Sequence, residues 1–277
     1  MKLSIIGLGF VGGSMLESFK IKTESNTEHT IYGYDKYKNG GIGTFEDCLD
    51  SDFIFLALPT EYDSAKKSYD TSIIEKVLDE LSLLGYNKCI VIKSTVEPTV
   101  TENLQQKHKD MHLIHNPEFL TAKTAFEDFH NQTHIVIGKS SLCSQEHVDN
   151  LEQFYKQFYP DVEISHCTCL ESESMKIYCN TFYAVKVQFF NELYLLSNKL
   201  GADYDTVVNL MLKNDWINPM HTKVPGPDGK LSYGGFCFPK DTNALLQAMK
   251  RAETPHSVLE ACIEERNEMR DDNTNCK

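Results

Sequence analysis

The chain has 277 residues, of which 41% are hydrophobic, and its formal net charge is −13. This size lies near the length at which one hydrophobic core divides into two, so we expect two domains. The acidic balance argues against nucleic acid and anionic membranes as partners, although a local basic site can still bind a small anion.

Cysteine usage and the N-terminal stretch predict a reducing, cytoplasmic location. The nine cysteines are an odd number without regular spacing, so they do not suggest a disulfide framework. The opening MKLSIIGLGFVGG runs directly into a strand and a glycine turn without a signal-peptide cleavage site, and no apolar run is long enough to span a membrane. Cys167 and Cys169 lack a second pair of ligands at metal-binding spacing, so no metal is expected.

The first element is a short apolar strand followed by a glycine turn and a helix, KLSIIGLGFVGGSML. Gly7, Gly9 and Gly12 fit the G-x-G-x-x-G pattern of dinucleotide-binding proteins. The first glycine permits the tight turn, the second lets a pyrophosphate approach the backbone, and the third lets the helix pack close to the strand. The helix N-terminus then offers N–H groups to the phosphates. Without context, the same pattern also fits a glycine-rich turn in another α/β protein.

A second strand, TIYGYDK, ends at Asp35, about 20 residues after Gly12. A carboxylate there can accept hydrogen bonds from the ribose hydroxyls of the adenosine half, and it repels a 2′-phosphate. Asp35 therefore favours NAD over NADP as the cofactor. The alternative is a solvated turn residue after a strand.

Apolar strands alternate with helices through residues 1–166, which predicts a Rossmann-type NAD-binding domain. The expected strands are DFIFLALPT, KCIVIKST, MHLIHNPEFL, THIVIGK and VEIS, and DTSIIEKVLDELSLLG predicts an amphipathic helix. This alternation predicts a parallel sheet covered on both faces, with ligands beyond the carboxyl ends of the strands. The side chains expected at that edge belong to residues 7–12, Asp35, Thr60, Thr95 and Glu118.

Residues 167–277 predict a smaller, all-helical domain with a long central helix. Residues 168–200 contain no proline or glycine, and apolar side chains recur at three- and four-residue steps, so one helix of about 30 residues is expected. Its apolar character favours a homodimer through this helix. Lys176 and Asn180 share one face of it. An amide without a partner is costly among aromatic residues, although a solvated lysine and a capping-type asparagine remain the alternative.

The stretch YGGFCFPKD, residues 233–241, ends a long loop that is rich in proline and glycine. Loops of this length inside a domain are usually functional. Pro239 suits the first turn of a helix, so the Cys237 thiol is expected just before a helix N-terminus, with Lys240 nearby. Both features favour the nucleophilic thiolate.

The stretches GLGFVGG, KSTV, NPEFL, ESESMKIYCNTFYAVKVQFFNE and GGFCFPKD together resemble the UDP-glucose/GDP-mannose dehydrogenase family over nearly the whole chain. The resemblance implies NAD as cofactor and a nucleotide sugar as substrate, whose CH₂OH group is oxidised to a carboxylate in two hydride transfers. Phe238 resembles the UDP-glucose branch, so oxidation of UDP-glucose to UDP-glucuronate is expected. GDP-mannose and UDP-N-acetylhexosamines are the alternative substrates.

The resemblance also implies catalytic roles for the matching residues. Cys237 would add to the first-formed aldehyde and carry a thiohemiacetal and then a thioester. Lys176 and Asn180 would stabilise the developing oxyanion, and Asp241 would act as a general base through water. The residues expected to hold the water and the nicotinamide end are Thr95 and Glu118.

The binding residues carried over from the family fall into two groups. The cofactor-binding residues are Gly7, Gly9, Phe10, Val11, Gly12, Asp35, Lys36, Pro59, Thr60, Ser94, Thr95 and Lys240. The substrate-binding residues are Glu118, Phe119, Leu120, Lys176, Asn180, His221, Pro227, Lys230, Tyr233, Gly234 and Cys237.

Three departures from the family pattern keep other readings open. Ala122 stands where a second glutamate is common, the segment between Asp35 and Phe53 is short, and the chain ends at Lys277, before the family's second nucleotide-type domain. The first and third departures favour a non-catalytic NAD or nucleotide-sugar binding module. A hydroxyacid or phosphogluconate-type dehydrogenase has a similar two-part layout and needs no thiol.

Overall fold

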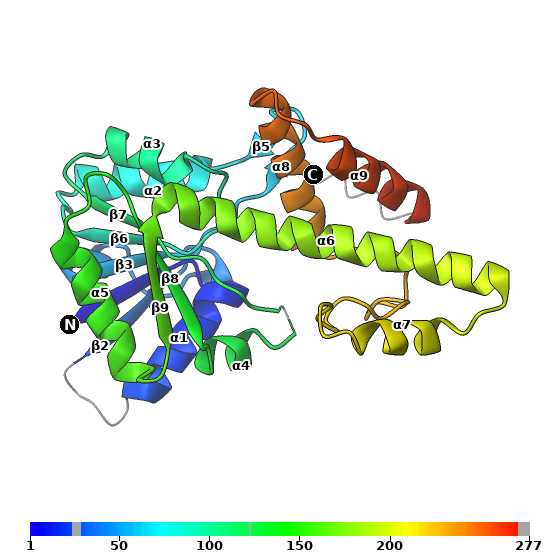
Figure 1. Cartoon of the computed structure of the whole chain (residues 1–277). Helices are drawn as coiled ribbons and strands as arrows, with labels where there is room; N and C mark the ends of the chain where they lie inside the picture. The colour runs from blue at the N-terminus through cyan, green and yellow to red at the C-terminus, as the bar shows by residue number, and fades with distance from the viewer. Residues whose placement is uncertain (24–28, 122, 271–277) are drawn as a thin grey trace. The chain divides into compact units, whose positions relative to one another are not determined.

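The computed structural model describes residues 1–23, 29–121 and 123–270 (Figure 1). The chain divides into two compact units, of which the first comprises Met1–Thr60 and Asp70–Lys176 and the second comprises Glu61–Tyr69 and Ile177–Lys277. The boundary predicted from the sequence lies between residues 166 and 167, before the long helix, and no sequence pattern indicates the excursion at residues 61–69. Ala122, the departure noted above, lies outside the described residues.

The first unit is built on a seven-stranded sheet with the order β2-β1-β3-β6-β7-β8-β9. The strands are β1 (Lys2–Ile6), β2 (Thr30–Tyr34), β3 (Phe53–Leu56), β6 (Cys89–Ile92), β7 (His112–His115), β8 (His134–Lys139) and β9 (Glu163–Thr168). The central strands β3, β6 and β7 are almost entirely buried, as expected for strands covered on both faces. The expected Rossmann-type α/β architecture is confirmed.

Helices cover both faces of this sheet, as Figure 1 shows. On one face, α1 (Phe10–Thr23), α4 (Ala125–His130) and α5 (Gln145–Phe158) pack over an aromatic-rich cluster that includes Phe19 and Tyr155. On the other face lie α2 (Ser72–Leu83) and α3 (Val100–Lys107). Between β2 and β3, in the short segment noted above, only two short 3₁₀ helices occur, η1 (Lys38–Gly40) and η2 (Glu46–Asp50).

One strand pairing differs from the all-parallel expectation. β8 runs antiparallel to β7, whereas β9 runs parallel to β8. A buried apolar run indicates that a strand is covered on both faces, but it does not state the direction in which the strand runs. The strands that precede the candidate site residues, β1, β2, β3, β6 and β7, are all mutually parallel, so their carboxyl ends share one edge.

The second unit is mainly helical. It contains most of α6 (Cys169–Leu200), together with α7 (Tyr204–Leu212), α8 (Cys237–Arg251) and α9 (Ser257–Met269). The predicted long helix is therefore confirmed. A two-stranded hairpin, β4 (Tyr62–Asp63) with β5 (Ser68–Tyr69), also belongs to this unit, which sequence patterning missed because each strand has only two residues. In the described parts of both units, no helix combines the length and apolarity that a membrane span requires.

Candidate active site

The turn after β1 has the geometry that the glycine pattern predicts. Gly7 has a φ of +89°, and a Cβ atom there would lie 2.5 Å from the carbonyl oxygen of Ala57. A Cβ atom on Gly12 would lie 1.9 Å from the carbonyl oxygen of Gly7, so α1 can approach the strand only with glycine at this position. A Cβ atom on Gly9 would meet nothing within 4 Å. The turn is therefore closely packed on its inner side and open at Gly9, where a ligand can approach the backbone.

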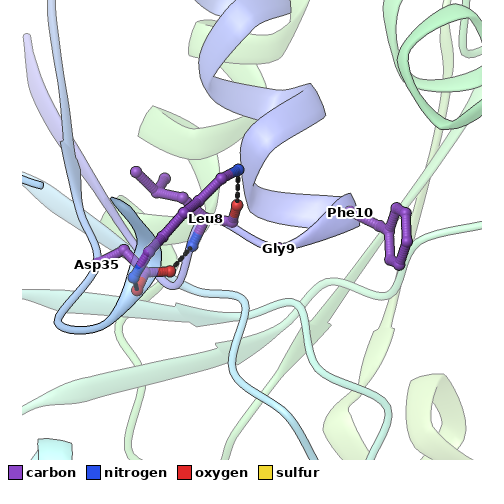
Figure 2. A pocket seen from close by; sticks show the side chains of 5 residues that line it. Leu8, Gly9, Phe10 and Asp35 are labelled. Carbon is purple, nitrogen blue, oxygen red and sulfur yellow. Dashed lines mark hydrogen bonds between the residues drawn. The ribbon is translucent and has the colours of Figure 1, made fainter. Parts of the chain in front are cut away.

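A cavity of about 440 Å³ opens at this turn, lined by Leu8, Gly9, Phe10, Asp35 and Lys38 (Figure 2). The Asp35 carboxylate reaches the turn, because its Oδ2 atom accepts the backbone N–H of Leu8 at 2.8 Å. Its Oδ1 atom accepts the N–H groups of Tyr37 and Lys38 at 2.9 and 2.8 Å. Burial raises the pKa of Asp35, but these hydrogen bonds and the Lys38 charge outweigh it and leave the pKa below its ordinary value.

Glu118, which the sequence predicts at the sheet edge, and Lys176, which it predicts on the long helix, are paired within the first unit. Lys176 is 4% exposed, and its ammonium donates to the carbonyl oxygen of Glu118 at 2.6 Å. The same ammonium lies 3.3 Å from Glu118 Oε1. Because both groups are nearly buried, this ion pair is much less screened than a surface pair. The structure therefore holds a fixed cation next to a carboxylate beyond the end of β7.

Asp241 is the centre of a buried hydrogen-bond network in the second unit. Its side chain is fully buried, Asn180 Nδ2 donates to Oδ2 at 2.6 Å, and Lys240 Nζ lies 2.8 Å from Oδ1. The Tyr69 hydroxyl also donates to Oδ1, and the Lys240 ammonium lies over the Tyr69 ring. The partner that the mid-helix amide of Asn180 requires is therefore Asp241. Tyr69, on the hairpin that sequence patterning missed, is an additional member of the network.

Cys237 is exposed and is the first residue of α8, one turn before Asp241. The sequence predicts the thiol just before the helix, whereas the helix begins at Cys237 itself. Pro239 stands in the first turn, which a helix tolerates because that N–H has no intrahelical acceptor. At this position the sulfur lies at the positive end of the helix dipole, which favours a thiolate.

Comparisons with known proteins agree with this geometry. Residues 41–159 match the NAD binding domain of the UDP-glucose/GDP-mannose dehydrogenase family, and residues 170–268 match the central domain of the same family. Together the two models cover well over half of the chain. This chain belongs to the UDP-glucose/GDP-mannose dehydrogenase family.

Individual relatives support the same family membership. The chain is 27% identical to the UDP-glucose 6-dehydrogenase of Campylobacter jejuni, over 95% of this chain and 71% of the relative. It is also 27% identical to the GDP-mannose 6-dehydrogenase of Pseudomonas aeruginosa, over 94% of this chain and 66% of the relative. The structure of a UDP-glucose dehydrogenase from Pyrobaculum islandicum is similar in fold, with a TM-score of 0.82 and 24% identity over 96% of this chain and 68% of that one. The chain thus spans roughly two thirds of these proteins.

NAD is the cofactor of this family's N-terminal domain, and the described residues fit it. The open side of the Gly9 turn gives a pyrophosphate access to the backbone at the N-terminus of α1. Asp35 Oδ1 already accepts two N–H groups, whereas Oδ2 accepts that of Leu8, so Oδ2 has the acceptor capacity for a ribose hydroxyl.

Lys38 is a cavity residue that sequence reasoning missed. Its ammonium donates to the Leu8 carbonyl at 2.5 Å, across the turn from Asp35. Lys36, which was predicted to contact the cofactor, is exposed and does not line the cavity. The signal that could have found Lys38 is the Asx-type turn after Asp35. In this turn the Asp35 carboxylate accepts the N–H groups two and three residues later, and residue 38 is thereby folded back toward the end of the strand.

Replacement of Asp35 by alanine is expected to weaken NAD binding by about 10-fold, since one charge-assisted hydrogen bond to a ribose hydroxyl is lost. The preference for NAD over NADP is expected to fall with it, because Lys38 remains at the cavity as a cation for the 2′-phosphate. Fluorescence titration of both cofactors into the wild type and the variant measures this. The matched control is the replacement of Asp47, an exposed carboxylate of η2, by alanine. If the ratio of the affinities for NAD and NADP is unchanged in Asp35→Ala, the assignment of Asp35 to the ribose is contradicted.

The loops after β3 and β6 are joined to each other by hydrogen bonds. The Thr60 hydroxyl donates to the Thr95 carbonyl at 2.7 Å, and the Ser94 hydroxyl donates to the Leu58 carbonyl at 2.7 Å and accepts the Leu58 N–H. Ser94 and Thr60 therefore use their hydroxyls to join the two loops. Pro59, which lies between these contacts, is exposed. Val11 directs its side chain to the core, so a cofactor role there falls to its backbone.

The residues after Glu118 also have defined surroundings. Glu118 Oε2 accepts the backbone N–H of Leu120 at 2.5 Å, which closes a small turn, and the Leu120 side chain packs against the core. The Phe119 ring is 43% exposed and stacks against His134. Lys176 Nζ lies 5.3 Å from the Phe119 ring centroid, so that ring covers one side of the buried ammonium.

The loop before Cys237 holds the remaining predicted substrate residues. His221 has a φ of +68°, and its ring packs between Tyr183 and Phe238. Pro227 and Lys230 lie on an exposed turn that is closed by the hydrogen bond from Gly226 N–H to Lys230 C=O. Tyr233 and Gly234 are less exposed than Pro227 and Lys230. The Tyr233 side chain is 2% exposed, and the Arg270 guanidinium lies against Gly234, so contacts from these two residues to a substrate would have to come from the backbone.

Glu173 binds the start of α6 to α3 within the first unit, and sequence reasoning did not single it out. Its carboxylate is fully buried and accepts the N–H groups of Thr99 and Thr101 at 2.7 Å, at the N-terminus of α3. Burial raises the pKa of Glu173 to about 7, although these hydrogen bonds lower it. The carboxylate lies one turn before Lys176 on the same helix, so it helps to fix that part of α6.

The raised pKa of Glu173 gives a pH-dependent stability with a defined sign. The folded state binds the proton of the Glu173 carboxyl more tightly than the unfolded state does. The stabilisation of the folded state by this proton is therefore present in full below the ordinary pKa of 4.5, and it is lost as the pH rises through about 7. Relative to Glu173→Gln, the wild type is expected to lose about 2 kcal/mol of stability between about pH 5 and pH 8. Urea unfolding of both proteins at the two pH values measures the difference, and parallel pH profiles would contradict the assignment.

Proposed function

We propose that this protein is an NAD-dependent nucleotide-sugar 6-dehydrogenase that oxidises UDP-glucose to UDP-glucuronate. The observation that carries the proposal is the arrangement in the second unit, where the exposed Cys237 begins α8 and the buried Asp241 follows one turn later, bound to Asn180. A structural cysteine in a core requires neither exposure nor a helix N-terminus. A nucleophile requires both, because the thiolate must form and must be reached by the substrate.

The proposed reaction needs a thiol because an aldehyde has no suitable hydride to lose toward the acid until a nucleophile adds to it. Bound NAD⁺ supplies the hydride acceptor for each of the two oxidation steps. Cys237 Sγ forms a bond to C6 of the aldehyde, and the carbonyl oxygen takes up a proton to give a thiohemiacetal. Oxidation at C6 converts this group to a thioester. Attack by water breaks the C–S bond, which releases the carboxylate and returns the thiol.

Five further side chains have proposed roles in these steps. Lys176 and Asn180, four residues apart on α6, are the donors for the oxygen on C6 as it becomes an alkoxide. Lys176 carries a fixed positive charge for that oxygen, whereas Asn180 contributes a neutral N–H. Asp241 is the base for the hydrolytic water, and the Asn180 amide holds its carboxylate in place. Thr95 and Glu118 are proposed to position water near the nicotinamide end.

UDP-glucose is the proposed substrate, and the experiment that tests it is a small panel of nucleotide sugars. NADH absorbance is followed with purified protein, NAD⁺ and, in turn, UDP-glucose, UDP-N-acetylmannosamine and GDP-mannose. UDP-glucose is expected to give the highest kcat/KM, with two NADH formed for each sugar consumed. A higher kcat/KM for GDP-mannose would change the substrate assignment. The similar protein from Pseudomonas aeruginosa, which is named GDP-mannose 6-dehydrogenase, gives a precedent for that sugar.

A non-catalytic binding module is the second candidate function, and the same experiment separates it from an enzyme. The presence of Cys237, Lys176, Asn180 and Asp241 argues against this candidate. Binding of NAD and UDP-glucose by calorimetry, without any NADH formation from the panel, would support it.

We further propose that two copies associate through α6. Five large apolar side chains on this helix are more than half exposed and recur at steps of four and seven residues, which places them on one face. They are Tyr178, Phe182, Phe189, Leu196 and Leu200. A continuous apolar face of this kind is typical of a surface that a partner covers, and a two-fold arrangement pairs it with itself.

Phe182→Glu together with Phe189→Glu is expected to convert this dimer to a monomer, because the charges would be buried without partners. Light scattering coupled to size-exclusion chromatography measures the mass of both proteins. Lys199→Glu, a charge change near the exposed end of the same helix, is the control and should remain dimeric. A wild-type protein that elutes as a monomer at micromolar concentration would contradict the proposal.

The buried thiols fit a reducing compartment, and the cytoplasm is the location that we propose. Cys48 and Cys262 are buried, and burial raises the pKa of each to about 11, so neither is poised to react. Cys237 is exposed by contrast, and it would be vulnerable to oxidation in an oxidising compartment. Its proposed role as a nucleophile therefore also favours a reducing location.

A further inference from the structure

Lys93 is a buried lysine that none of the roles above uses. It directly follows β6, is 2% exposed and belongs to the first unit. Its Nζ atom donates to the Asn116 side-chain oxygen at 3.0 Å and to the Pro117 carbonyl at 3.3 Å. Buried lysines are rare because the removal of an ammonium group from water costs roughly several kcal/mol, even after the surrounding protein relaxes. A lysine in such a place therefore calls for an explanation beyond packing.

The surroundings of Lys93 show that it is not needed to neutralise a carboxylate. Among the residues that the structure describes, Glu118 is the carboxylate that acts on Lys93, and it is already paired with Lys176. Burial lowers the pKa of Lys93 to about 7, Glu118 raises it, and Lys176 lowers it further. His115 also faces this cluster, and burial together with Lys93 lowers its pKa to about 3, so its ring is neutral. An apolar side chain would be the less costly choice if packing were the only requirement.

The partners of Lys93 are the two residues that immediately precede Glu118. Asn116 is 1% exposed, and the Tyr155 hydroxyl donates to its side-chain oxygen at 2.6 Å. The Asn116 amide in turn donates to the Val136 carbonyl at 2.6 Å. The start of the loop after β7 is therefore tied to β6, β8 and α5. Pro117 stiffens the next step of the chain, because its φ is fixed.

Lys93 and Lys176 thus hold successive carbonyl groups of the same loop. Lys93 binds the carbonyl of Pro117, and Lys176 binds the carbonyl of Glu118 at 2.6 Å. A displacement of the first carbonyl moves the second, since the two are adjacent in the chain. The Lys176 ammonium is held by that second carbonyl and by the Glu118 carboxylate, so its position depends on the loop.

We propose that Lys93 is a positioning residue for the catalytic lysine, because it sets the loop 116–118 whose Glu118 carbonyl and carboxylate hold Lys176. This inference rests on the proposed function in so far as Lys176 is the oxyanion donor. In this role Lys93 acts through the loop 116–118 and not directly on the substrate or the cofactor. Displacement of a catalytic group by about 1 Å can cost about 10²-fold in rate, so an indirect effect of this kind is measurable.

Lys93→Met tests the proposal, because methionine has a similar length and keeps the site filled while it removes both hydrogen bonds. Lys88→Met is the matched control, a partly exposed lysine just before the same strand that pairs with Asp52. The first readout is a crystal structure of each variant. In Lys93→Met the Glu118 carbonyl is expected to move away from Lys176 Nζ, and in Lys88→Met the contact is expected to remain.

The second readout is steady-state kinetics with UDP-glucose. Lys93→Met is expected to lower kcat at least about 10-fold, while the Kd for NAD stays within about two-fold. In a Lys176→Met background, the same substitution is expected to lower kcat by less than about a further two-fold. A purely structural role would not produce this non-additivity. An intact contact between Glu118 and Lys176 in the Lys93→Met crystal, or an unchanged kcat, overturns the proposal.

Two provisions keep the test decisive. If the wild type forms no NADH with any sugar of the panel, the proposed function fails, whereas the crystal structure of Lys93→Met still decides whether Lys93 positions the loop. If Lys93→Met does not fold, Tyr155→Phe replaces it, since it removes one hydrogen bond to the Asn116 oxygen and keeps the ring in the core. It is expected to shift the loop and lower kcat in the same direction by a smaller factor, and no change in either would overturn the proposal.

Discussion

Cys237→Ser is expected to abolish net formation of UDP-glucuronate, with kcat reduced by about 10³-fold or more. A serine hydroxyl at the start of α8 is far less ionised than a thiol, so it adds poorly to the aldehyde and forms an ester that hydrolyses less readily than a thioester. The Kd for NAD is expected to stay within about two-fold, since the cavity at the Gly9 turn is built by the first unit. Product analysis by chromatography, together with NADH absorbance, measures this result.

Cys167→Ser is the matched control for that experiment. Cys167 is a half-buried thiol on β9, and burial raises its pKa, so it lacks the features that favour a thiolate. Its replacement should leave kcat unchanged. Full turnover by Cys237→Ser would instead favour the hydroxyacid or phosphogluconate-type dehydrogenase reading, which needs no thiol.

Lys176→Met is expected to lower kcat by about 10²- to 10³-fold, which is the usual effect of removing one preorganised donor to an oxyanion. The ammonium is nearly buried and held by Glu118, so its charge acts on a developing alkoxide with little screening. The Kd for NAD is expected to change by less than about two-fold, because the interaction is made in the transition state. Single-turnover NADH formation, combined with fluorescence titration of NAD, separates the two quantities.

Lys199→Met, at the exposed end of the same helix, is the control for the loss of a lysine from α6. Because Lys176→Met leaves the Glu118 carboxylate without its main partner, thermal unfolding of each variant checks that the fold is retained. A variant that loses NAD binding and keeps its rate at saturating NAD would show that Lys176 serves the cofactor and not the oxyanion.

Much of the candidate site could be located from short sequence patterns, because each of them is a local requirement of the backbone. Gly7 and Gly12 occupy positions where a Cβ atom would clash with backbone oxygens, and Asp35 directly follows a strand of the parallel part of the sheet. The long helix was visible in its uninterrupted 3.6-residue period, and the thiol was visible beside Pro239. These signals depend on neighbours in the chain, so they can be read without coordinates.

The positions of Lys93, Tyr69 and Glu173 could not be read in this way. Each acquires its role from a partner distant in sequence, such as Asn116 for Lys93, Asp241 for Tyr69 and the α3 N-terminus for Glu173. The antiparallel direction of β8 was equally hidden, since a buried apolar strand has the same composition in either direction.

The sequence by itself determined the glycine turn, the acidic end of β2, the long helix and the thiol before a proline, because periodicity, backbone conformation and capping are local properties of the chain. Only the tertiary structure decided which buried polar groups pair with one another. A buried lysine or carboxylate is tolerated where folding supplies its partners, and those partners come from elements that the sequence order keeps far apart.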